Sequence, residues 1–399
     1  MAVEVAIVGG GYGGVRALEH LCRDEALRIT LIDQHAYHYM QTEVYDFIAN
    51  KMDVSELMVD LASLCASYGS ERVRFVNSQV VGIDREHKRI ETTSGPVSYD
   101  YLILATGSRT YFPDFIKGLR EHAHGVKSVS AALEFKQQFE RALFDRIESQ
   151  REGCDTADFN IVVGGAGLSG VEIAAEMAAF ANAFYKRGNF GCRAPKVYLI
   201  DAYETILYGM DRFLVETAYR RLISLGVEVL HNNRIAAVEA DEIVLEGGER
   251  LPYAFMIFTG GIIASTLTGK LGFERTAKGH LEIRDTLQVK EDDSIFAIGD
   301  IANICAADGR MLPPTAQLAE RSAEHAAKNI RRLVAGKEPF SFRPSIRGVM
   351  VALGGEYGAG ILPGGIRIKG YTAYLVKKAI FWLYKRPLRL RTAIGARKK

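Results

Sequence analysis

The sequence predicts an α/β protein that contains two parallel-sheet units and a separate helical segment at its C-terminal end. Twice along the chain a β-branched apolar run leads into a glycine-rich turn and then into residues with helical spacing. The two runs are VEVAIVGG at residues 3–10 and FNIVVGG at residues 159–165. Strands that are apolar throughout are typical of a parallel sheet with both faces covered, so we expect the α/β class.

The first turn has the spacing G-x-G-x-x-G at Gly9, Gly11 and Gly14, and a helical pattern follows it. In such a turn the first glycine allows the bend, the second lets the backbone approach a pyrophosphate, and the third lets helix and strand pack closely. The helix N-terminus then faces the negative charge. The next strand, RITLID, ends in Asp33, which is placed to bond the hydroxyls of an adenosine ribose. We therefore expect a dinucleotide here.

The second turn repeats this pattern at Gly165, Gly167 and Gly170. A helix follows, and the strand KVYLID ends in Asp201 after a longer interval than in the first copy. An acid with no Arg immediately after it favours NAD over NADP, because a 2′-phosphate would meet a carboxylate. Two dinucleotide units predict two dinucleotides, and a flavin with a nicotinamide is the economical pair.

Two further segments, DYLILATGSR at 100–109 and DSIFAIGDIA at 293–302, suggest which turn holds which cofactor. With them the chain resembles the two-dinucleotide-binding-domain flavoprotein superfamily. The resemblance implies that Thr106 and Gly107 mark where the chain leaves the flavin domain. It also implies that Gly299 and Asp300 mark the return, with Asp300 approaching the ribityl chain of the flavin. FAD would then bind at the first turn and NADH at the second.

The domain organisation that this resemblance implies is a split FAD domain with an NADH domain inserted in it. We expect two Rossmann-like domains and a C-terminal membrane-associating helical segment. The expected boundaries are 1–110 and 262–338 for the FAD domain, 111–261 for the NADH domain and 339–399 for the C-terminal membrane-anchoring region.

The cysteines limit what the flavin can reduce. Five of them lie far apart, with no C-x-x-C pair and no Cys/His cluster at metal-binding spacing: Cys22, Cys65, Cys154, Cys192 and Cys305. We therefore expect no metal site and no disulfide framework. The stretch HAYHYMQTEVYDF lacks the cysteine pair of the disulfide reductases, which argues against dithiol exchange. Sulfide:quinone oxidoreductases need a late cysteine, and none follows Cys305. The acceptor should be a quinone, oxygen or a protein.

A quinone is favoured by the segment PPTAQLAER at 313–321, which resembles the A-Q-x-A-x-Q motif of type II NADH dehydrogenases. Ala316, Gln317 and Ala319 match the motif, whereas Arg321 replaces its last Gln. The resemblance implies that this helix N-terminus lies beside the flavin and that Gln317 helps to form the quinone pocket. The alternative is that this Gln, in the first turn of a helix, is merely exposed to solvent.

Glu172 is the second candidate catalytic residue, after Gln317. It follows the second glycine turn, and the resemblance implies a role in relaying protons or coupling the two sites. An acid in a first helical turn is also favoured by the helix dipole alone. Both interpretations can hold together, because an acid partly buried beside a cofactor can have the raised pKa that proton transfer requires.

The C-terminal tail is strongly basic. After Glu356 there are eleven Lys and Arg residues and no Asp or Glu. Leu375, Ala379 and Leu383 form one helical stripe, and Trp382 and Tyr384 suit a membrane interface. This pattern predicts a helix that lies in the plane of an anionic membrane. We therefore expect a peripheral, monotopic protein on the cytoplasmic face of the cell membrane.

Other partners for this tail are a protein surface and a nucleic acid. The helix could instead pack on the protein body or on a partner subunit, as in a homodimer, with its lysines solvated. We expect no nucleic-acid binding, because the basic residues alternate with an apolar stripe. The N-terminus has no secretory signal pattern, and no apolar run approaches the roughly 20 residues of a membrane-spanning helix.

The function predicted from these patterns is two-electron transfer from NADH through FAD to a membrane quinone, without proton pumping. Three alternatives remain open: a sulfide:quinone oxidoreductase-like enzyme, a soluble NADH-dependent reductase of ferredoxin or rubredoxin, and a flavoprotein that senses NADH without rapid turnover.

Overall fold

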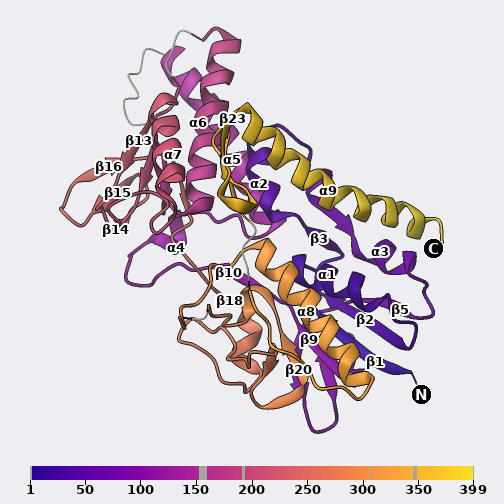
Figure 1. Ribbon diagram of the computed structural model, residues 1–399. Coiled ribbons are helices and arrows are strands. Elements are labelled where there is room, and N and C mark those ends of the chain that lie inside the picture. Colours follow the sequence, from indigo (N-terminus) through magenta and orange to yellow (C-terminus); the bar gives the residue numbers. More distant parts are fainter. Residues whose placement is uncertain (1, 152–159, 191–193, 307, 345–347, 399) are drawn as a thin grey trace.

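Two separate parallel sheets organise the chain, and a long C-terminal helix lies across one side of the molecule (Figure 1). The arrangement confirms the predicted α/β class. The computed structural model describes residues 2–151, 160–190, 194–306, 308–344 and 348–398.

The first sheet joins strands from both ends of the sequence, in the order β19-β20-β9-β1-β2-β5. The order places β20 beside β9, in parallel, with Ile295 opposite Leu102. Only β19, at the edge, is antiparallel to its neighbour. The strands are β1 (Val3–Val8), β2 (Leu27–Asp33), β5 (Val73–Asn77), β9 (Tyr101–Leu104), β19 (Gln288–Val289) and β20 (Asp292–Ala297).

Several helices share a buried core with the first sheet, and the long C-terminal helix, described below, adds one residue to it. They are α1 (Tyr12–Leu21), α3 (Leu61–Ser67) and α8 (Ala316–Val334). Helices α1 and α8 pack against each other, although about 300 residues separate them in the sequence. Small antiparallel elements surround this unit: β3 (Tyr37–Tyr39) with β4 (Met58–Asp60), and β6 (Val80–Asp84) with β7 (Arg89–Thr92) and β8 (Val97–Ser98).

The second sheet is parallel throughout, in the order β13-β12-β11-β17. Successive residues of β11 face different cores: Ile161 and Val163 pack with the helices, and Val162 packs with a small antiparallel sheet on the other face. The parallel strands are β11 (Ile161–Gly164), β12 (Val197–Ile200), β13 (Val227–Leu230) and β17 (Phe255–Phe258).

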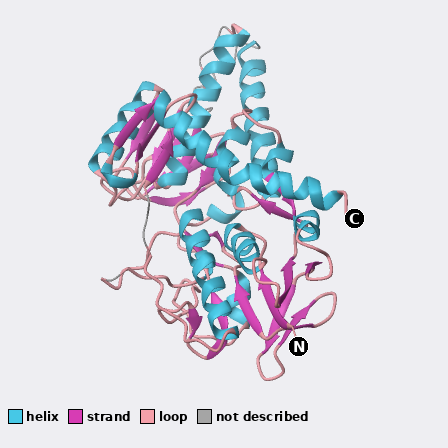
Figure 2. Ribbon diagram, turned by 45° about the vertical axis from the view of Figure 1, so that its right-hand side comes forward, coloured by secondary structure: helices cyan, strands magenta, loops and turns pink. Residues whose placement is uncertain are grey.

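The elements that cover the second sheet are three longer helices on one face and three short strands on the other. The helices are α5 (Val129–Arg151), α6 (Leu168–Gly188) and α7 (Arg212–Ser224), and the strands are β14 (Ile235–Val238), β15 (Glu242–Leu245) and β16 (Arg250–Pro252). Figure 2 shows these helices as a layer beside the strands. The short helix α4 (Leu119–His122) lies near β14.

The chain passes between the two units twice, at β10 (Ser108–Thr110) and β18 (Ile262–Ala264). These two strands pair with each other in an antiparallel ribbon, with Arg109 opposite Ile263. The two crossings therefore lie side by side, so the residues between them form a single inserted unit.

The C-terminal region consists of a three-stranded antiparallel sheet and helix α9 (Tyr371–Ala396). It contacts both units: Val351 and Leu353 belong to the core of the second sheet, and Leu388 of α9 belongs to the core of the first. The strands are β21 (Val349–Ala352), β22 (Gly358–Ile361) and β23 (Arg367–Gly370). None of the helices in the described ranges combines the length and the apolar character that crossing a bilayer requires.

The cysteines that the structure describes, Cys22, Cys65 and Cys305, form no disulfide with one another. Cys154 and Cys192 lie outside the described residues.

Candidate functional site

The two glycine turns have nearly the same backbone geometry. The first glycine of each has a positive φ, +110° at Gly9 and +96° at Gly165, which residues with side chains rarely adopt. A Cβ at Gly14 would lie 1.7 Å from the Gly9 carbonyl oxygen, and one at Gly170 would lie 1.8 Å from that of Gly165. Close helix–strand packing thus requires glycine at both positions.

The middle glycines face open space. A Cβ at Gly11 or Gly167 would have no atom of the described protein within 4 Å. Each is the N-cap of the helix that follows, α1 or α6, and each lacks a side chain that could cap the first N–H groups. Those N–H groups and the positive end of the helix dipole can therefore hold an anion such as a pyrophosphate.

Asp33 and Asp201 hold the two turns in the same way. Asp33 accepts hydrogen bonds from the backbone N–H of Gly10 at 2.6 Å and of His35 at 2.7 Å. Asp201 accepts from the N–H of Ala166 and, at 2.8 Å, from that of Tyr203. Each acid lies beside the turn that the sequence assigned to it.

The remaining residues predicted for the first cofactor lie at the carboxyl ends of neighbouring strands. Gly9 follows β1, Thr106 and Gly107 follow β9, and Gly299 and Asp300 follow β20, and these three strands are adjacent. Ligands of open α/β sheets bind at this edge. The structure therefore brings the predicted FAD residues to one place.

Thr106 supports a ligand at this edge. Its hydroxyl oxygen is buried and has no hydrogen-bond partner in the part of the chain that the structure describes. Leaving a buried hydroxyl unsatisfied costs about 1–3 kcal/mol, so such groups usually have a partner. Together with the open space at Gly11, this orphaned hydroxyl fits a bound dinucleotide.

Asp300 belongs to a polar group that the sequence had indicated only in part. Ser108 donates a hydrogen bond to its carboxylate at 2.7 Å, and the Lys127 ammonium lies 3.8 Å from the same oxygen. Burial lowers the pKa of Lys127, and the neighbouring Asp300 partly offsets that effect. Both contacts are made by the same carboxylate oxygen, Oδ2.

Ala316 and Gln317 start helix α8 beside Gly299. Thr315 caps this helix by accepting a hydrogen bond from the Leu318 N–H at 3.1 Å. The Ser322 hydroxyl of the next turn accepts one from the Gly299 N–H, also at 3.1 Å. The N-terminus of α8 is thereby fixed against the Gly-Asp segment. Gln317 and Arg321 are both half-buried and lie four residues apart on one helix face.

Glu172 lies in α6 and is joined to the C-terminal helix. Its carboxylate accepts a hydrogen bond from the Ala352 N–H at 2.9 Å and forms an ion pair with Lys377 of α9. Both charged side chains are about nine-tenths buried. Tyr45, from helix α2 (Val44–Ile48), has its ring 4.7 Å from the Lys377 ammonium. Burial raises the pKa of Tyr45 far above its ordinary value, and the negative charge of Glu172 adds to the effect.

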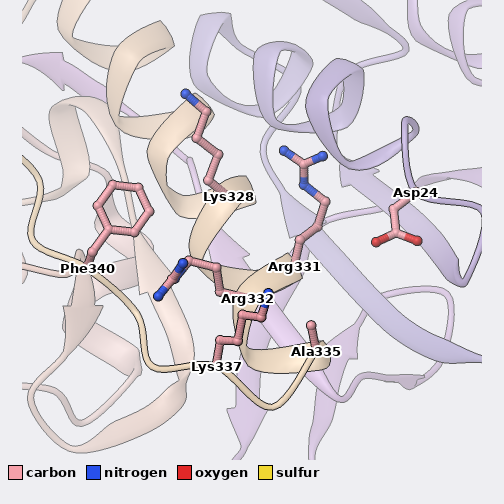
Figure 3. A pocket seen from close by; sticks show the side chains of 7 residues that line it. All are labelled: Asp24, Lys328, Arg331, Arg332, Ala335, Lys337 and Phe340. Atoms are coloured by element: carbon pink, nitrogen blue, oxygen red, sulfur yellow. The ribbon is translucent and has the colours of Figure 1, made fainter.

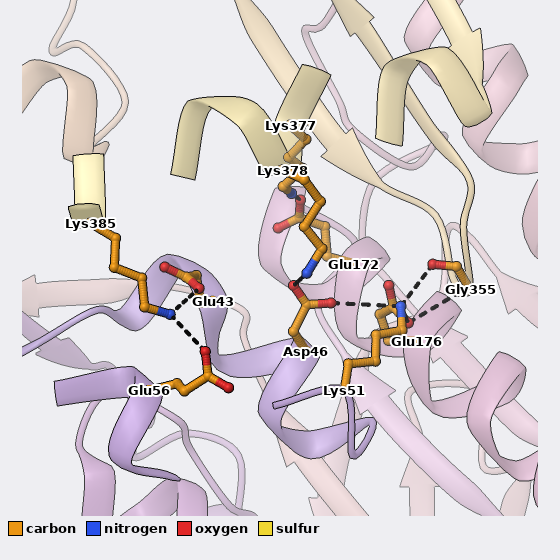
Figure 4. A network of polar contacts seen from close by, with 10 residues as sticks. All are labelled: Glu43, Asp46, Lys51, Glu56, Glu172, Glu176, Gly355, Lys377, Lys378 and Lys385. Carbon is orange, nitrogen blue, oxygen red and sulfur yellow. Dashed lines mark hydrogen bonds and ion pairs between the residues drawn. The ribbon is translucent and has the colours of Figure 1, made fainter. Parts of the chain in front are cut away.

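Further lysines of α9 face acids of the protein body (Figure 4). Lys378 donates to Asp46 at 2.9 Å, and Lys385 donates to Glu43 at 3.2 Å and to Glu56 at 3.4 Å. A similar ion pair lies next to them, in which Lys51 donates to Glu176 of α6 at 2.6 Å. Three of the tail lysines are therefore paired with carboxylates on the inner side of α9.

The outer side of α9 carries many exposed apolar residues, with Arg386 among them. Its exposed residues include a row with helical spacing: Leu375, Ala379, Trp382, Leu383, Leu390 and Ile394. The sequence had indicated this stripe but not which side of the helix would face the protein. Lys377 and Tyr45 were not among the predicted site residues, and the basic composition of the tail was the signal that pointed toward Lys377.

A solvent-facing hollow of about 410 Å³ lies away from these residues (Figure 3). It is formed at the last turns of α8, about 14 residues or some 21 Å along the helix from Gln317. Its cations complement the negative end of that helix. The lining residues are Asp24, Lys328, Arg331, Arg332, Ala335, Lys337 and Phe340.

Comparison with known proteins gives concordant results. Residues 3–323 match the pyridine nucleotide-disulphide oxidoreductase family. The chain is 30% identical over 386 residues to a type II NADH:quinone oxidoreductase of Staphylococcus epidermidis, covering 94% of each chain, and equally to one of Staphylococcus aureus.

Two solved structures are similar in fold at low sequence identity. NDH2 from Plasmodium falciparum in complex with NADH matches with a TM-score of 0.82 at 18% identity, over 99% of this chain and 97% of that one. A sulfide:quinone oxidoreductase from Aquifex aeolicus matches with a TM-score of 0.81 at 19% identity, over 98% and 92%.

Proposed function

The chain belongs to the type II NADH:quinone oxidoreductases, within the pyridine nucleotide-disulphide oxidoreductase family, and we propose how its residues oxidise NADH and reduce a membrane quinone. The observation that carries the proposal is that both dinucleotide turns are intact in a chain related over 94% of its length to NADH:quinone oxidoreductases. FAD is assigned to the turn at Gly9 and NADH to the turn at Gly165. The FAD domain is assigned to 1–110 and 262–338, the NADH domain to 111–261 and the C-terminal region to 339–399.

The FAD-binding residues of this assignment have distinct tasks. The N-terminus of α1 holds the pyrophosphate, Asp33 holds the ribose, and Thr106 and Asp300 bond polar groups of the cofactor. When bound, FAD supplies hydride acceptance from NADH and two-electron donation to the quinone. In the NADH domain, the α6 N-terminus and Asp201 perform the equivalent binding, and Asp201 favours NADH over NADPH.

Proton supply is assigned to Glu172. The net reaction converts NADH, one proton and a quinone into NAD⁺ and a quinol, so one proton must enter from the protein side for each turnover. Glu172 is buried, and both Lys377 and Tyr45 lie beside its carboxylate. A positioned carboxylate of this kind can hold a proton and pass it on. Gln317, in the first turn of α8, is assigned to the quinone pocket.

The membrane is assigned to the outer side of α9. Its lysines 377, 378 and 385 are paired with acids of the protein. They therefore stabilise the packing of α9 against the protein rather than its contact with lipid. The exposed row from Leu375 to Ile394 instead offers apolar side chains to the acyl region, and Arg386 beside Trp382 can reach anionic head groups. The enzyme would thus lie on the membrane surface, where the quinone is, and we assign this surface to the cytoplasmic side.

Vesicle flotation tests this assignment. The double variant Leu383→Ser/Leu390→Ser should lose most of its recovery with vesicles that contain phosphatidylglycerol. Phe115→Ser, a control at a residue that is 78% exposed on another part of the protein, should keep it. If the double variant floats normally and light scattering instead detects dissociation of a homodimer, the apolar side of α9 is a subunit interface.

Steady-state oxidation of NADH by the purified flavoprotein, with and without a short-chain quinone, tests the function itself. We expect the quinone to stimulate the reaction strongly. Ferredoxin or rubredoxin should not replace the quinone as acceptor, and sulfide should not replace NADH as donor. The absence of any cysteine after Cys305 disfavours the sulfide reaction despite the similar fold. Slow reoxidation of the flavin with every quinone supplied would contradict the proposal and favour a sensor of NADH.

A further inference from the structure

A buried histidine connects the first glycine turn to the C-terminal helix. His38, in β3, is fully buried. Its Nδ1 lies 3.0 Å from the carbonyl oxygen of Gly10, in the middle of the turn, and its Nε2 lies 3.0 Å from the hydroxyl of Tyr384 on α9. The hydrogen bond to Tyr384 joins residues that are 346 positions apart, and the one to Gly10 joins residues 28 positions apart.

The direction of both hydrogen bonds follows from the chemistry of the partners. A carbonyl oxygen only accepts, so Nδ1 carries the proton and donates to Gly10. Burial lowers the pKa of His38 to about 4, and the ring is therefore neutral near pH 7. Its Nε2 is then unprotonated and accepts from the Tyr384 hydroxyl.

The hydrogen bond to Gly10 orients the peptide between Gly10 and Gly11. In a planar trans peptide the C=O and the following N–H point in opposite directions. With the Gly10 carbonyl held toward His38, the Gly11 N–H points away from it. Gly11 is the N-cap of α1 and borders the open space assigned to the pyrophosphate.

The surroundings keep the histidine and the tyrosine in place. Tyr12, the first residue of α1, lies edge-on to the His38 ring at 5.0 Å and 5.1 Å from the Tyr384 ring. One residue further along α9, Lys385 is paired with Glu43. At the end of α9, Gly395 approaches α3 so closely that a Cβ would lie 1.7 Å from the Ser63 carbonyl oxygen. Tyr384 is therefore positioned only when α9 is seated.

The second turn lacks this connection. The carbonyl that corresponds to Gly10 is that of Ala166, and it accepts a hydrogen bond at 2.8 Å from the backbone N–H of Leu207. This donor belongs to the loop after β12 in the same domain. The second turn is thus held by its own domain, whereas the first turn is held through α9.

We propose that Tyr384, acting through His38, is a positioning residue for FAD, so that the seating of the C-terminal helix controls how firmly the first turn retains the flavin. This inference rests on the assignment of FAD to the first turn. His38 contacts the turn and Tyr384 contacts His38. Neither residue takes part in the transfer of electrons.

The test is the rate at which FAD leaves the full-length holoprotein, followed by the fluorescence of the released flavin after dilution. Tyr384→Phe removes only the hydroxyl, and we expect release about fivefold faster, the size expected for one lost hydrogen bond. His38→Phe should accelerate release about tenfold or more, because the Gly10 carbonyl then loses its donor. The double variant should be no faster than His38→Phe alone, since Tyr384 acts through the histidine.

Two controls separate this role from general destabilisation. Tyr374→Phe removes a hydroxyl from the same helix one turn before Lys378 and should leave FAD release unchanged. Binding of ADP-ribose to the second turn should remain within twofold in every variant, whereas a loosened fold would weaken both sites.

Release within twofold of the parent rate for both Tyr384→Phe and His38→Phe would overturn the proposal, as would a double variant in which the two effects multiply. If His38→Phe does not fold, Tyr384→Phe and its control decide alone. Both ligands are measured without turnover, so a failure of quinone reduction does not affect the result. A parent protein that binds no FAD would instead contradict the proposed function.

Discussion

The two glycine turns are closed by the same geometry but complete their hydrogen bonds differently. Thr259 in the second unit donates to the carbonyl oxygens of Gly164 and Gly165, at 3.1 and 2.8 Å. Thr106, at the end of the neighbouring strand in the first unit, has a buried hydroxyl with no partner among the described groups. The threonine of the second turn is therefore satisfied without a ligand, and that of the first turn is not.

This difference matches the tasks assigned to the two nucleotides. A turn that leaves a buried polar group for its ligand is less stable when empty, by about 1–3 kcal/mol for such a group. A turn that satisfies itself can be vacated in every catalytic cycle at little cost. Similar backbone traces can thus serve a resident cofactor and an exchanging substrate, and the polar groups around them make the distinction.

The largest expected effect comes from adding a methyl group at the third glycine of each turn. Gly14→Ala should yield protein without FAD, because its Cβ would overlap the Gly9 carbonyl. Gly170→Ala should retain FAD, but NADH should reduce its flavin about a hundredfold more slowly. That corresponds to an activation free energy higher by on the order of 3 kcal/mol. Flavin absorbance and stopped-flow reduction measure the two effects. Gly247→Ala, in open space, is the control, and equal loss of FAD in both variants would break the distinction between the turns.

The next effect concerns the ion pair that joins α9 to the second unit. Lys377→Met leaves the buried Glu172 carboxylate without its cation, which should lower the free energy of unfolding by about 3–5 kcal/mol. Denaturant unfolding measures this loss, and Lys377→Met/Glu172→Gln should recover part of it. ADP-ribose affinity should stay unchanged in the folded variant. A weakened second site would mean that α9 supports both turns.

Acidification should affect the first turn selectively. The pKa of His38 is about 4 in the folded protein, below the ordinary value near 6.5, so the unfolded chain binds the additional proton between these values. The contribution of His38 to the free energy of unfolding is therefore complete above pH 6.5. It declines as the pH falls and is about 2 kcal/mol smaller at pH 5. The groups that face the ring are Tyr12, Tyr384 and Asp33.

Measurement of FAD release from pH 7 to pH 4, where about half of the His38 rings in the folded protein are protonated, checks this expectation. Release should accelerate in the parent protein and change less in His38→Phe. The second turn should retain ADP-ribose over the same range, because a backbone N–H holds its carbonyl and does not titrate. His20, whose pKa burial also lowers to about 4, adds a slope to global stability that persists in the variant. An unchanged slope of FAD release in His38→Phe would show that another group is responsible.

The smallest effect is expected at the two threonines. Thr106→Val removes the orphaned hydroxyl, so the protein without FAD should become more stable by about 1 kcal/mol while FAD binds more weakly. Thr259→Val should instead destabilise the protein by about 1 kcal/mol, since two carbonyls lose a donor. Thermal unfolding of the apoprotein and titration with FAD distinguish the two. The same sign of change in both variants would contradict the comparison.

The nucleotide turns could be predicted because their chemistry is local in the sequence. Three glycines, a flanking strand and an acid at the end of the next strand determine each turn, and all of these residues lie within a few dozen positions. The α/β class followed from the same runs. The residues of the Gly-Asp segment could be added only through resemblance, since nothing in their own pattern reveals that β20 lies beside β9.

The contacts of α9 could not be predicted because they are distant and depend on which side of the helix faces inward. Helical spacing placed Leu375, Ala379 and Leu383 on one stripe, and the structure exposes that stripe. It gave no sign that Lys377 would meet Glu172 or that Tyr384 would meet His38, because the partners lie more than 200 residues away. Burying lysines beneath an apolar outer side reverses the usual arrangement, and only the positions of the acids explain it.

The hydroxyl of Tyr384 also has a consequence for the order of events during synthesis. Every strand of both sheets precedes it in the sequence, so the ribosome completes the two nucleotide units before this side chain exists. The turn at Gly165 has all of its backbone partners by then, whereas the turn at Gly9 still waits for the last helix to dock. The unit whose first strand begins the sequence is thus the last to mature.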